Sequence, residues 1–589
     1  MLSRSWSAHR AHYDFLIIGS GYGGAIAAAR LATAKVSPRP SICVLERGRE
    51  WPTGSFPDTM PEILRERRGP LNPLGLYDLL TFPDISVIKG NGLGGTSLVN
   101  ANVAIVPEAD VFRLAGWPAS LSLDTLRPYY DRARQVLAAA PHPNARRLAK
   151  VQMLDRRARE TGAEAFPLDI AVNFTVTGAN SYGAEQKPCT DCGDCITGCN
   201  VGAKNTLAMN YLPMAASAGA EIHTQAEVDR ISRRPGGGWR VHGSRVNHAL
   251  SKEPFEMTAA NVILAAGSIN STEILLRSEM RGLSVSPKVG SNFSGNGDFF
   301  GLAYNGNHRT NVCGFGNHPG APAAAFAPGP TIVGGIRYPD GRLEQSMLIE
   351  DLSFASGYVD TARLALALLR GEDTDPGDQR REARRVQRDV APFTAVHPDG
   401  ALNHTMVYLC MGFDDARGAM VLETSPLHPD GRLEIHWQDV GAQGVFSRLD
   451  NELRRHARAL GARFISSPLW ALFEMRPLLT AHPLGGCPIG EDYQHGAVDE
   501  YGRVFTGDGA VHEGLFVADG ALVPSALGVN PFLTISALAE RIVERKIQQM
   551  QGIAYPAPGT SVGFSGVDRI EVVRHPEGEL DPLEPGAVE

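Results

Sequence analysis

A glycine-rich turn close to the N-terminus constrains the fold of this chain more than any other feature. Residues 13–18 have the apolar pattern of a short buried strand, and the run Gly19-Ser20-Gly21-Tyr22-Gly23-Gly24 follows directly. An alanine-rich stretch, 25–34, is typical of a helix, and a second apolar strand, 41–45, ends at Glu46. Strand, turn, helix and strand in this order predict a β-α-β unit.

Three of these glycines have the spacing of a dinucleotide-binding turn. Gly19 allows the tight turn, Gly21 lets a pyrophosphate approach the backbone, and Gly24 lets helix and strand pack closely. The helix N-terminus offers free N–H groups to the phosphates, and a ribose can bind the carboxylate that follows about 20 residues later. The alternative is a tight turn whose small residues serve packing only, and the unit alone does not separate FAD from NAD. The predicted nucleotide contacts are Gly19, Gly21, Tyr22, Gly23, Gly24 and Glu46.

Length and composition describe a large globular protein. The chain has 589 residues, which is more than one hydrophobic core ordinarily holds, so two or more domains are expected. A net charge of -8 argues against a nucleic-acid partner. No stretch reaches the roughly 18 apolar residues that span a bilayer, and residues 1–12 lack the apolar core of a signal peptide, so we expect a cytoplasmic protein.

Helical and strand patterns continue along the chain. The expected elements are a helical region at 121–161, strands at 221–231, 262–266 and 514–517, and helices at 271–277 and 531–549. After about residue 550 the chain is rich in Pro, Gly and Glu, which is typical of a loosely held tail.

Several further segments resemble the glucose–methanol–choline (GMC) oxidoreductases. The run Gly90-Asn91-Gly92-Leu93-Gly94-Gly95-Thr96-Ser97-Leu98-Val99-Asn100 is similar to their first signature, and Gly267-Ser268-Ile269-Asn270-Ser271-Thr272 to their second, from which Thr272 and Glu279 depart. The segments His482-Pro483-Leu484-Gly485-Gly486-Cys487, Asp519-Gly520 and Gly528-Val529-Asn530-Pro531-Phe532 resemble the cholesterol oxidase branch. The resemblance extends from about residue 13 to 550.

This resemblance implies an α/β fold, α+β overall, with two domains. A Rossmann-like FAD-binding domain would be assembled from the discontinuous segments 10–110, 200–300 and 480–550. A substrate domain with a mixed β-sheet would comprise 111–199 and 301–479, including a cluster of cysteines, and 551–589 would form the tail.

The resemblance also implies where FAD lies. The segment Gly90 to Asn102 would run beside the flavin, with Asn100 and Asn102 at its edge, and the backbone of Val228 would meet the adenine. The helix that begins near Asn530 would direct its free N–H groups toward the N1–C2=O edge of the flavin. The implied cofactor contacts are Gly92, Gly95, Ser97, Asn100, Asn102, Val228, Gly267, Asp519, Gly520, Asn530, Pro531 and Phe532.

Alcohol oxidation requires a base for the hydroxyl proton and an acceptor for the hydride, which is flavin N5 in this family. The resemblance assigns the base to His482 and a polar partner to Asn530. Histidine suits the task because its ordinary pKa lies near neutrality. The nearest candidate for the glutamate with which flavin cholesterol oxidases isomerise the steroid double bond is Glu350, whose alternative role is a structural carboxylate in a strand.

Four of the eight cysteines follow one another closely, at Cys189, Cys192, Cys195 and Cys199. The spacing C-x2-C-x2-C-x3-C is that of bacterial ferredoxins, in which thiolates bind an iron–sulfur cluster. We predict such a cluster, with a role in passing electrons from the flavin to an external acceptor. A purely structural cluster, a structural zinc ion and disulfides are the alternatives.

Arg380, Arg381, Arg384, Arg385 and Arg388 lie on an expected helix that follows the apolar residues 364–369. Such a surface can contact an anionic membrane peripherally, and a solvated helix face is the alternative.

These features predict an FAD-dependent oxidoreductase that acts on a small-molecule alcohol, namely a sterol or a similarly bulky compound. Two alternatives remain open. One is an FAD and iron–sulfur dehydrogenase of sugars or glucosides, and the other is a flavin electron-transfer protein without catalysis, which would not need the pair of His482 and Asn530.

Overall fold

The strand that precedes the glycine turn, β1, lies at the centre of an eight-stranded sheet. The computed structural model describes residues 1–246, 251–316, 326–339, 341–369, 371–390, 396–467, 470 and 477–555. The sheet has the order β10-β2-β1-β13-β12-β11, and β24 pairs with both β13 and β23. Its strands are β1 (His12–Ile18), β2 (Ile42–Leu45), β10 (Glu221–His223), β11 (Ala226–Arg233), β12 (Trp239–Val246), β13 (Lys252–Leu264), β23 (Arg503–Phe505) and β24 (Val511–Val517).

The long strand β13 divides this sheet into a parallel and an antiparallel part. Its last residues, 262–264, pair in parallel with β1 and β24, whereas it pairs antiparallel with β12 over most of its length. The residues of the parallel part are buried on both faces, as the continuous apolar pattern of β1 and β2 predicts.

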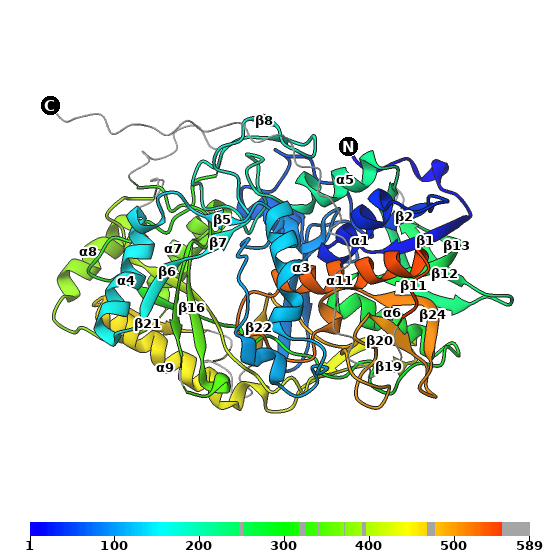
Figure 1. Ribbon diagram of the computed structural model, residues 1–589. Helices are drawn as coiled ribbons and strands as arrows, with labels where there is room; N and C mark the ends of the chain where they lie inside the picture. Colours follow the sequence, from blue (N-terminus) through cyan, green and yellow to red (C-terminus); the bar gives the residue numbers. More distant parts are fainter. Residues whose placement is uncertain are drawn as a thin grey trace, which may run out of the picture.

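Helices from both ends of the chain cover the parallel part. α1 (Tyr22–Thr33) packs on α11 (Phe532–Met550) and on α5 (Tyr211–Ser217), and α3 (Leu123–Val136) packs on α11. Figure 1 shows this group on the right, with the first and last helices of the domain side by side. The first sheet therefore draws on three separate stretches of the chain, as expected for a discontinuous FAD-binding domain. The exact domain boundaries remain a prediction.

A second large sheet lies on the left in Figure 1 and has the order β17-β21-β14-β18-β16-β15-β6. Every pairing described in it is antiparallel, so the mixed sheet expected here is more uniform than predicted. The helices α4 and α9 pack against it. The bounds are β6 (Glu164–Pro167), β14 (Phe299–Tyr304), β15 (Gly334–Tyr338), β16 (Met347–Leu352), β17 (Glu372–Asp373), β18 (Met406–Met411), β21 (Arg463–Ser466), α4 (Ala149–Thr161) and α9 (Gly444–Ala459).

Smaller elements connect the two sheets. A three-stranded sheet joins β3 (Tyr77–Thr81) and β4 (Ile85–Gly90) to β22 (Leu478–Thr480), which pairs with β4 in parallel. The remaining helices and strands outside the two large sheets are α2 (Met60–Arg65), α6 (Gly267–Glu279), α7 (Ser356–Leu368), α8 (Gln379–Val390), β5 (Ala140–Pro141), β7 (Asp169–Ile170), β8 (Gly178–Ala179), β9 (Glu185–Gln186), β19 (Ala419–Ser425) and β20 (His428–His436).

Two expected elements are interrupted. The helical region 121–161 breaks into α3 and α4, because Pro141 and Pro143 between them lack the N–H that a continuous helix needs. The strand 221–231 breaks into β10 and β11 at Gln225, whose φ is 64°. Residues 556–589, most of the expected tail, lie outside the described part of the chain.

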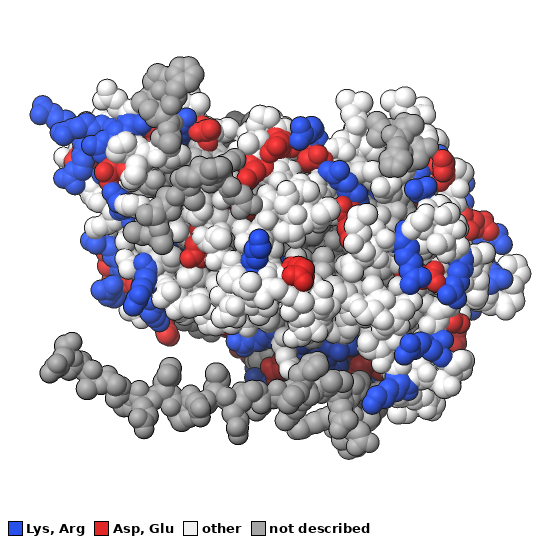
Figure 2. Space-filling model, turned by 90° about the horizontal axis from the view of Figure 1, so that it is seen from above, with Lys and Arg blue, Asp and Glu red and all other residues white. Residues whose placement is uncertain are grey.

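The arginine-rich stretch forms the helix α8, as expected. Arg380, Arg381, Arg384 and Arg388 are exposed, whereas Arg385 is buried. Figure 2 shows basic side chains gathered at the left end of the molecule, where α8 lies in Figure 1. Contact of this face with a membrane surface remains a prediction. No helix in the described ranges is long and apolar enough to cross a bilayer.

One buried carboxylate ties together the helices that cover the first sheet. Glu540 on α11 is fully buried and accepts hydrogen bonds from Arg30 of α1 at 2.8 Å and from the Tyr211 hydroxyl of α5 at 2.7 Å. Arg132 of α3 lies 3.4 Å away. The carboxylate of Glu540 thus connects four helices from distant parts of the sequence.

We expect Glu540→Ala to lower the free energy of unfolding by about 3–5 kcal/mol, because it leaves the largely buried Arg30 unpaired. Thermal and urea denaturation measure this change. Glu160→Ala is the control, because Glu160 is 45% exposed and pairs with Arg157 within one helix, where the loss should stay below about 1 kcal/mol. Equal losses in the two variants would contradict the role of Glu540.

Candidate active site

The glycine turn brings the N-terminus of α1 against the ends of two strands. A Cβ atom on Gly23 would lie 1.6 Å from the Ala518 carbonyl oxygen, and one on Gly24 would lie 2.0 Å from that of Gly19. A Cβ on Gly21 would meet no atom within 4 Å. Packing therefore requires glycine at 23 and 24, whereas Gly21 faces space through which a ligand can reach the helix N-terminus.

Glu46 fixes the turn from the other side. Its Oε2 accepts hydrogen bonds from the Ser20 amide at 3.2 Å and the Ser20 hydroxyl at 2.5 Å, and its Oε1 accepts one from the Gly48 amide at 2.8 Å. Its carbonyl accepts a hydrogen bond from the Ala226 amide, which places the start of β11, and with it Val228, beside the end of β2. Contacts of Glu46 with a ribose and of Val228 with adenine remain predictions.

The second glycine-rich segment lies directly on the turn. The Gly94 amide donates to the Ser20 hydroxyl at 2.9 Å, and a Cβ on Gly95 would lie 3.0 Å from Gly21 Cα. Ser97 is buried, and its hydroxyl donates to the Gly94 carbonyl at 2.7 Å. The structure thus brings together the two segments that the sequence assigns to one cofactor.

Buried polar atoms without a hydrogen-bond partner among the described residues follow this segment. Asn100 Nδ2 donates to the Tyr22 hydroxyl at 2.8 Å, but its Oδ1 is unpaired. Asn102 is 3% exposed, and its Nδ2 is unpaired. The Tyr22 ring stacks at 4.8 Å on Phe532, which begins α11 directly after Pro531. Because buried polar groups are almost always hydrogen-bonded, these orphan groups mark the wall of a ligand site that suits FAD.

Asp519 joins the glycine turn after β13 to the end of β24. Its Oδ2 accepts hydrogen bonds from the Gly267 amide at 2.8 Å and the Ser271 hydroxyl at 2.5 Å, and its Oδ1 accepts one from the Ala521 amide at 2.9 Å. Burial raises the pKa of this carboxyl. Gly520 is buried beside it, so three of the predicted contacts, Gly267, Asp519 and Gly520, lie together.

His482 is oriented by a carboxylate that sequence reasoning missed. Its Nδ1 lies 2.7 Å from Oδ1 of Asp298, whose side chain is 1% exposed. Asp298 Oδ2 accepts hydrogen bonds from the Thr480 hydroxyl at 2.8 Å and the Ala481 amide at 2.9 Å, so its own position is fixed. A proton on Nδ1 leaves Nε2 free as an acceptor. No motif containing Asp298 distinguishes it in the sequence.

Asn530 pairs with Glu350 in a buried site. Its Nδ2 donates to Glu350 Oε2 at 3.2 Å, whereas Asn530 Oδ1 and Glu350 Oε1 have no partner in the described part of the chain. Burial raises the pKa of Glu350 well above its ordinary value, Asn530 counteracts this, and the nearby charges of Asp351 and Asp298 raise it further. The protonated form of Glu350 is therefore favoured.

A short connector, 294–298, links the histidine to the asparagine. Ser294 exchanges two backbone hydrogen bonds with Leu484, two residues after His482, and Asp298 bonds the histidine itself. Asn296 Nδ2 donates to the Val529 carbonyl at 2.8 Å, next to Asn530. The connector thus brings together two residues that are 48 positions apart in the sequence.

The four clustered cysteines line one small pocket in a loop that contains neither helix nor strand. All four are free thiols, so the disulfide alternative finds no support. Burial raises the pKa of Cys189, Cys192 and Cys195, and Lys204 opposes this rise at Cys195. In the described ranges no three His, Cys, Asp or Glu side chains converge on a point where a single metal ion could bind. The thiols as they stand form no mononuclear metal site.

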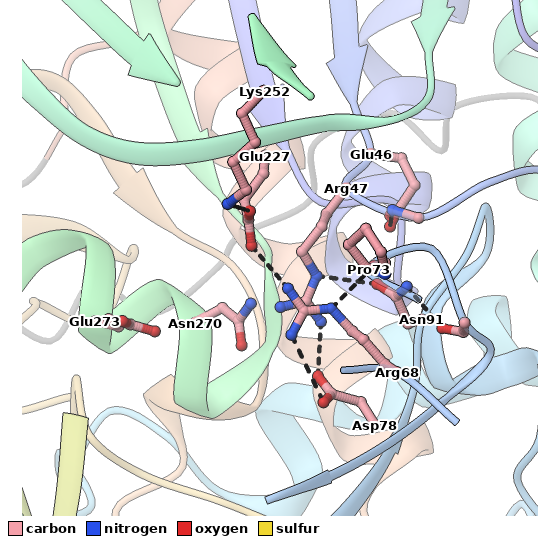
Figure 3. Close-up of polar contacts among 12 residues, drawn as sticks. Glu46, Arg47, Arg68, Pro73, Asp78, Asn91, Glu227, Lys252, Asn270 and Glu273 are labelled. Carbon is pink, nitrogen blue, oxygen red and sulfur yellow. Dashed lines mark hydrogen bonds and ion pairs between the residues drawn. The ribbon is translucent and has the colours of Figure 1, made fainter. Parts of the chain in front are cut away.

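A cluster of charges lies beside the end of β2, and sequence reasoning missed it as well (Figure 3). Arg47 donates to Asp78 on β3 at 2.9 Å, and Arg68 donates to Glu227 on β11 at 2.9 Å. Burial alone would raise the pKa of Asp78, but Lys89, Arg47 and Arg68 outweigh it and hold the pKa at about 2. These ion pairs fix the β3–β4 hairpin against the first sheet. The charged residues of this cluster come from separate segments of the sequence, so no local sequence pattern predicts the cluster.

Comparison with known proteins identifies the family. The GMC oxidoreductase models match residues 13–296 and 459–539, which together exceed half of the chain. The chain belongs to the GMC oxidoreductase family. Members of this family bind FAD, so the cofactor implied by the family resemblance is confirmed at the level of the family.

Relatives and solved structures agree with this assignment. Cholesterol oxidases of Mycobacterium tuberculosis and Acinetobacter baumannii are 28% and 26% identical to this GMC oxidoreductase over 90% of its length, covering 90% and 93% of their own. A long-chain-alcohol oxidase of Arabidopsis thaliana is 24% identical over 92% of this chain and 68% of its own. A fungal aryl-alcohol oxidase structure shares the fold, with a TM-score of 0.57, 16% identity, and coverage of 92% of this chain and 100% of its own.

The contrast between Gly21 and Gly23 allows a matched test of the turn. We expect Gly21→Ala to fold normally, because its Cβ meets no neighbour and its φ of −65° suits alanine, but to bind FAD at least 10-fold more weakly, since the methyl group occupies the approach of the pyrophosphate. Gly23→Ala should not fold stably. Circular dichroism and FAD titration of the deflavinated protein measure both. Wild-type FAD affinity in Gly21→Ala would contradict this placement.

Proposed function

We propose that this GMC oxidoreductase oxidises the CH–OH group of a sterol or a similarly bulky alcohol to a ketone. The observation that carries the proposal is the pair of buried Asp298 and half-buried His482, joined by the connector 294–298 to Asn530. The names of the cholesterol oxidase relatives support a sterol-like substrate. A histidine and an asparagine at these positions also resemble the cholesterol oxidase branch more than branches with two histidines.

The bound FAD would supply the hydride acceptor, and the residues of the chain would handle the proton. Asp298 holds Nδ1 of His482, so the ring is oriented and its Nε2 can take the proton of the alcohol hydroxyl. The resulting imidazolium would lie beside the carboxylate of Asp298, which stabilises the positive charge.

Asn530 would hold the alcohol oxygen, and Glu350 would orient its amide. The two ends of an amide are exchanged by a simple rotation. With Glu350 protonated, its O–H can donate to Asn530 Oδ1, which turns the amide N–H groups toward the substrate oxygen. This arrangement would give Asn530 Oδ1, which lacks a partner, a hydrogen-bond donor. Glu350 then acts by positioning Asn530, and a role in isomerisation remains a separate proposal.

Mutation of His482 tests the catalytic role. We expect His482→Ala to slow flavin reduction by alcohols about 10²- to 10⁴-fold under anaerobic conditions, because the hydroxyl proton loses its acceptor. Stopped-flow bleaching of the flavin band measures this, with sterols, long-chain alcohols and glycosides as substrates. His495→Ala, at an exposed histidine, is the control. Asp298→Asn should give an intermediate loss. Unchanged reduction in His482→Ala would contradict the role of His482 as the base, whereas a wild-type flavin that none of these alcohols reduces would favour the non-catalytic electron-transfer protein.

The four-thiol pocket supports a second part of the proposal, namely that an iron–sulfur cluster passes electrons to an external acceptor. Four free thiols surround one pocket, and the ferredoxin spacing suits a cluster of several iron atoms, which occupies more space than a single ion. This feature also keeps open an FAD and iron–sulfur dehydrogenase of sugars or glucosides, which the substrate panel distinguishes.

If the cluster relays electrons, the enzyme should reduce a one-electron dye faster than it forms peroxide. Cys192→Ser should abolish this advantage and lower the iron and acid-labile sulfide content, while alcohols still bleach the flavin. Cys43→Ser, on β2 and outside the pocket, is the control. The relay would be refuted by an unchanged ratio of dye reduction to peroxide formation in the Cys192 variant.

A further inference from the structure

A buried lysine lies at the wall of the cysteine pocket. Lys204 is 1% exposed and lines the pocket together with the four cysteines. Its Nζ donates to the carbonyl oxygens of Cys195 at 2.9 Å and of Asn100 at 2.7 Å. The ammonium group is therefore hydrogen-bonded, but both acceptors are neutral carbonyls.

The charge of Lys204 has no carboxylate partner among the residues that the structure describes; its acidic neighbours are the thiols of Cys195 and Cys199. The other fully buried lysine that lies near this loop, Lys150, differs in this respect, because it pairs with Asp351 at 2.8 Å. A buried ammonium without a counter-charge is strongly unfavourable. Negative charge in the pocket would therefore stabilise the ammonium group of Lys204.

Metal-bound cysteines supply such charge. Cysteine ligates metals as the thiolate, and four thiolates around an iron–sulfur core leave the centre with a net negative charge. Four neutral thiols would leave Lys204 uncompensated.

Lys204 also joins the pocket to the predicted flavin site. Asn100, whose carbonyl it binds, donates its side-chain amide to Tyr22 of the glycine turn and carries an unpaired Oδ1. One side chain therefore spans the cysteine loop and the segment predicted to lie beside the flavin, through two hydrogen bonds.

We propose that Lys204 is the counter-ion of an anionic iron–sulfur cluster bound by Cys189, Cys192, Cys195 and Cys199, and that it couples this cluster to the flavin-side segment at Asn100. The inference rests on the proposed function. Oxidation of one alcohol releases two electrons and two protons; two molecules of an external one-electron acceptor take the electrons, and solvent takes the protons. Lys204 is a positioning residue, because its positive charge favours the reduced, more negative cluster.

The midpoint potential of the cluster tests this role. The holoenzyme, purified anaerobically, is analysed for iron and acid-labile sulfide and then titrated with dithionite while electron paramagnetic resonance follows the cluster. Lys204→Met should shift the midpoint potential to a lower value, because the reduced cluster loses its counter-ion. Lys204→Arg should retain a potential close to the wild type. Lys546→Met, a buried lysine on α11, is the matched control and should leave the potential unchanged.

The outcomes separate this inference from the proposal on which it rests. An iron-containing Lys204→Met enzyme with the wild-type potential would overturn the counter-ion role alone. A wild-type enzyme without iron and labile sulfide would overturn the cluster and, with it, this inference. Loss of iron from Lys204→Met but not from Lys204→Arg supports the role, whereas loss from both variants overturns it.

Discussion

The close approach of backbone to backbone at the glycine turn is the constraint on which the rest of the structure depends. Gly23 touches the carbonyl of Ala518, and Gly24 touches that of Gly19, at separations that exclude any Cβ atom. This contact brings β1, α1 and the end of β24 together although they come from opposite ends of the chain. The N-terminus of α1 consequently opens toward one shared space, which the 90–102 segment and the start of α11 also border.

The candidate active site is held together in a different way, by hydrogen bonds from side chains to loop residues. The residues of the connector 294–298 hold both His482 and the turn before Asn530. Each of the two proposed active-site side chains, His482 and Asn530, has a buried acidic partner. Asp298 accepts three hydrogen bonds, whereas Glu350 accepts one from Asn530 and burial raises its pKa. In the proposed reaction, one acid would stabilise a proton on histidine while the other would orient an amide.

Local sequence patterns predicted most single strands, helices and turns well. The glycine turn, β1, β2, α6 and α11 lie close to where apolar period and glycine spacing put them, and the family resemblance is confirmed. The helix expected over 121–161 is two helices, because Pro141 and Pro143 cannot supply the N–H groups that a continuous helix needs. Asp298, Lys204 and the Arg47–Asp78–Arg68 cluster were not predicted, because their partners lie far away in sequence and no spacing rule links them.

The first sheet is completed only by β23 and β24, the last strands of the described residues. β24 pairs with β13, β22 pairs with β4, and α11 packs on α1, so elements beyond residue 477 cover one element of the middle of the chain and two made within the first hundred residues. During synthesis the N-terminal β-α-β unit must therefore wait for nearly the whole polypeptide before its apolar surfaces are covered. Stable capture of FAD is accordingly a late event in the biogenesis of this protein. An N-terminal fragment that ends before β22 would expose the surfaces against which β24 and α11 pack, and would be a natural client of chaperones.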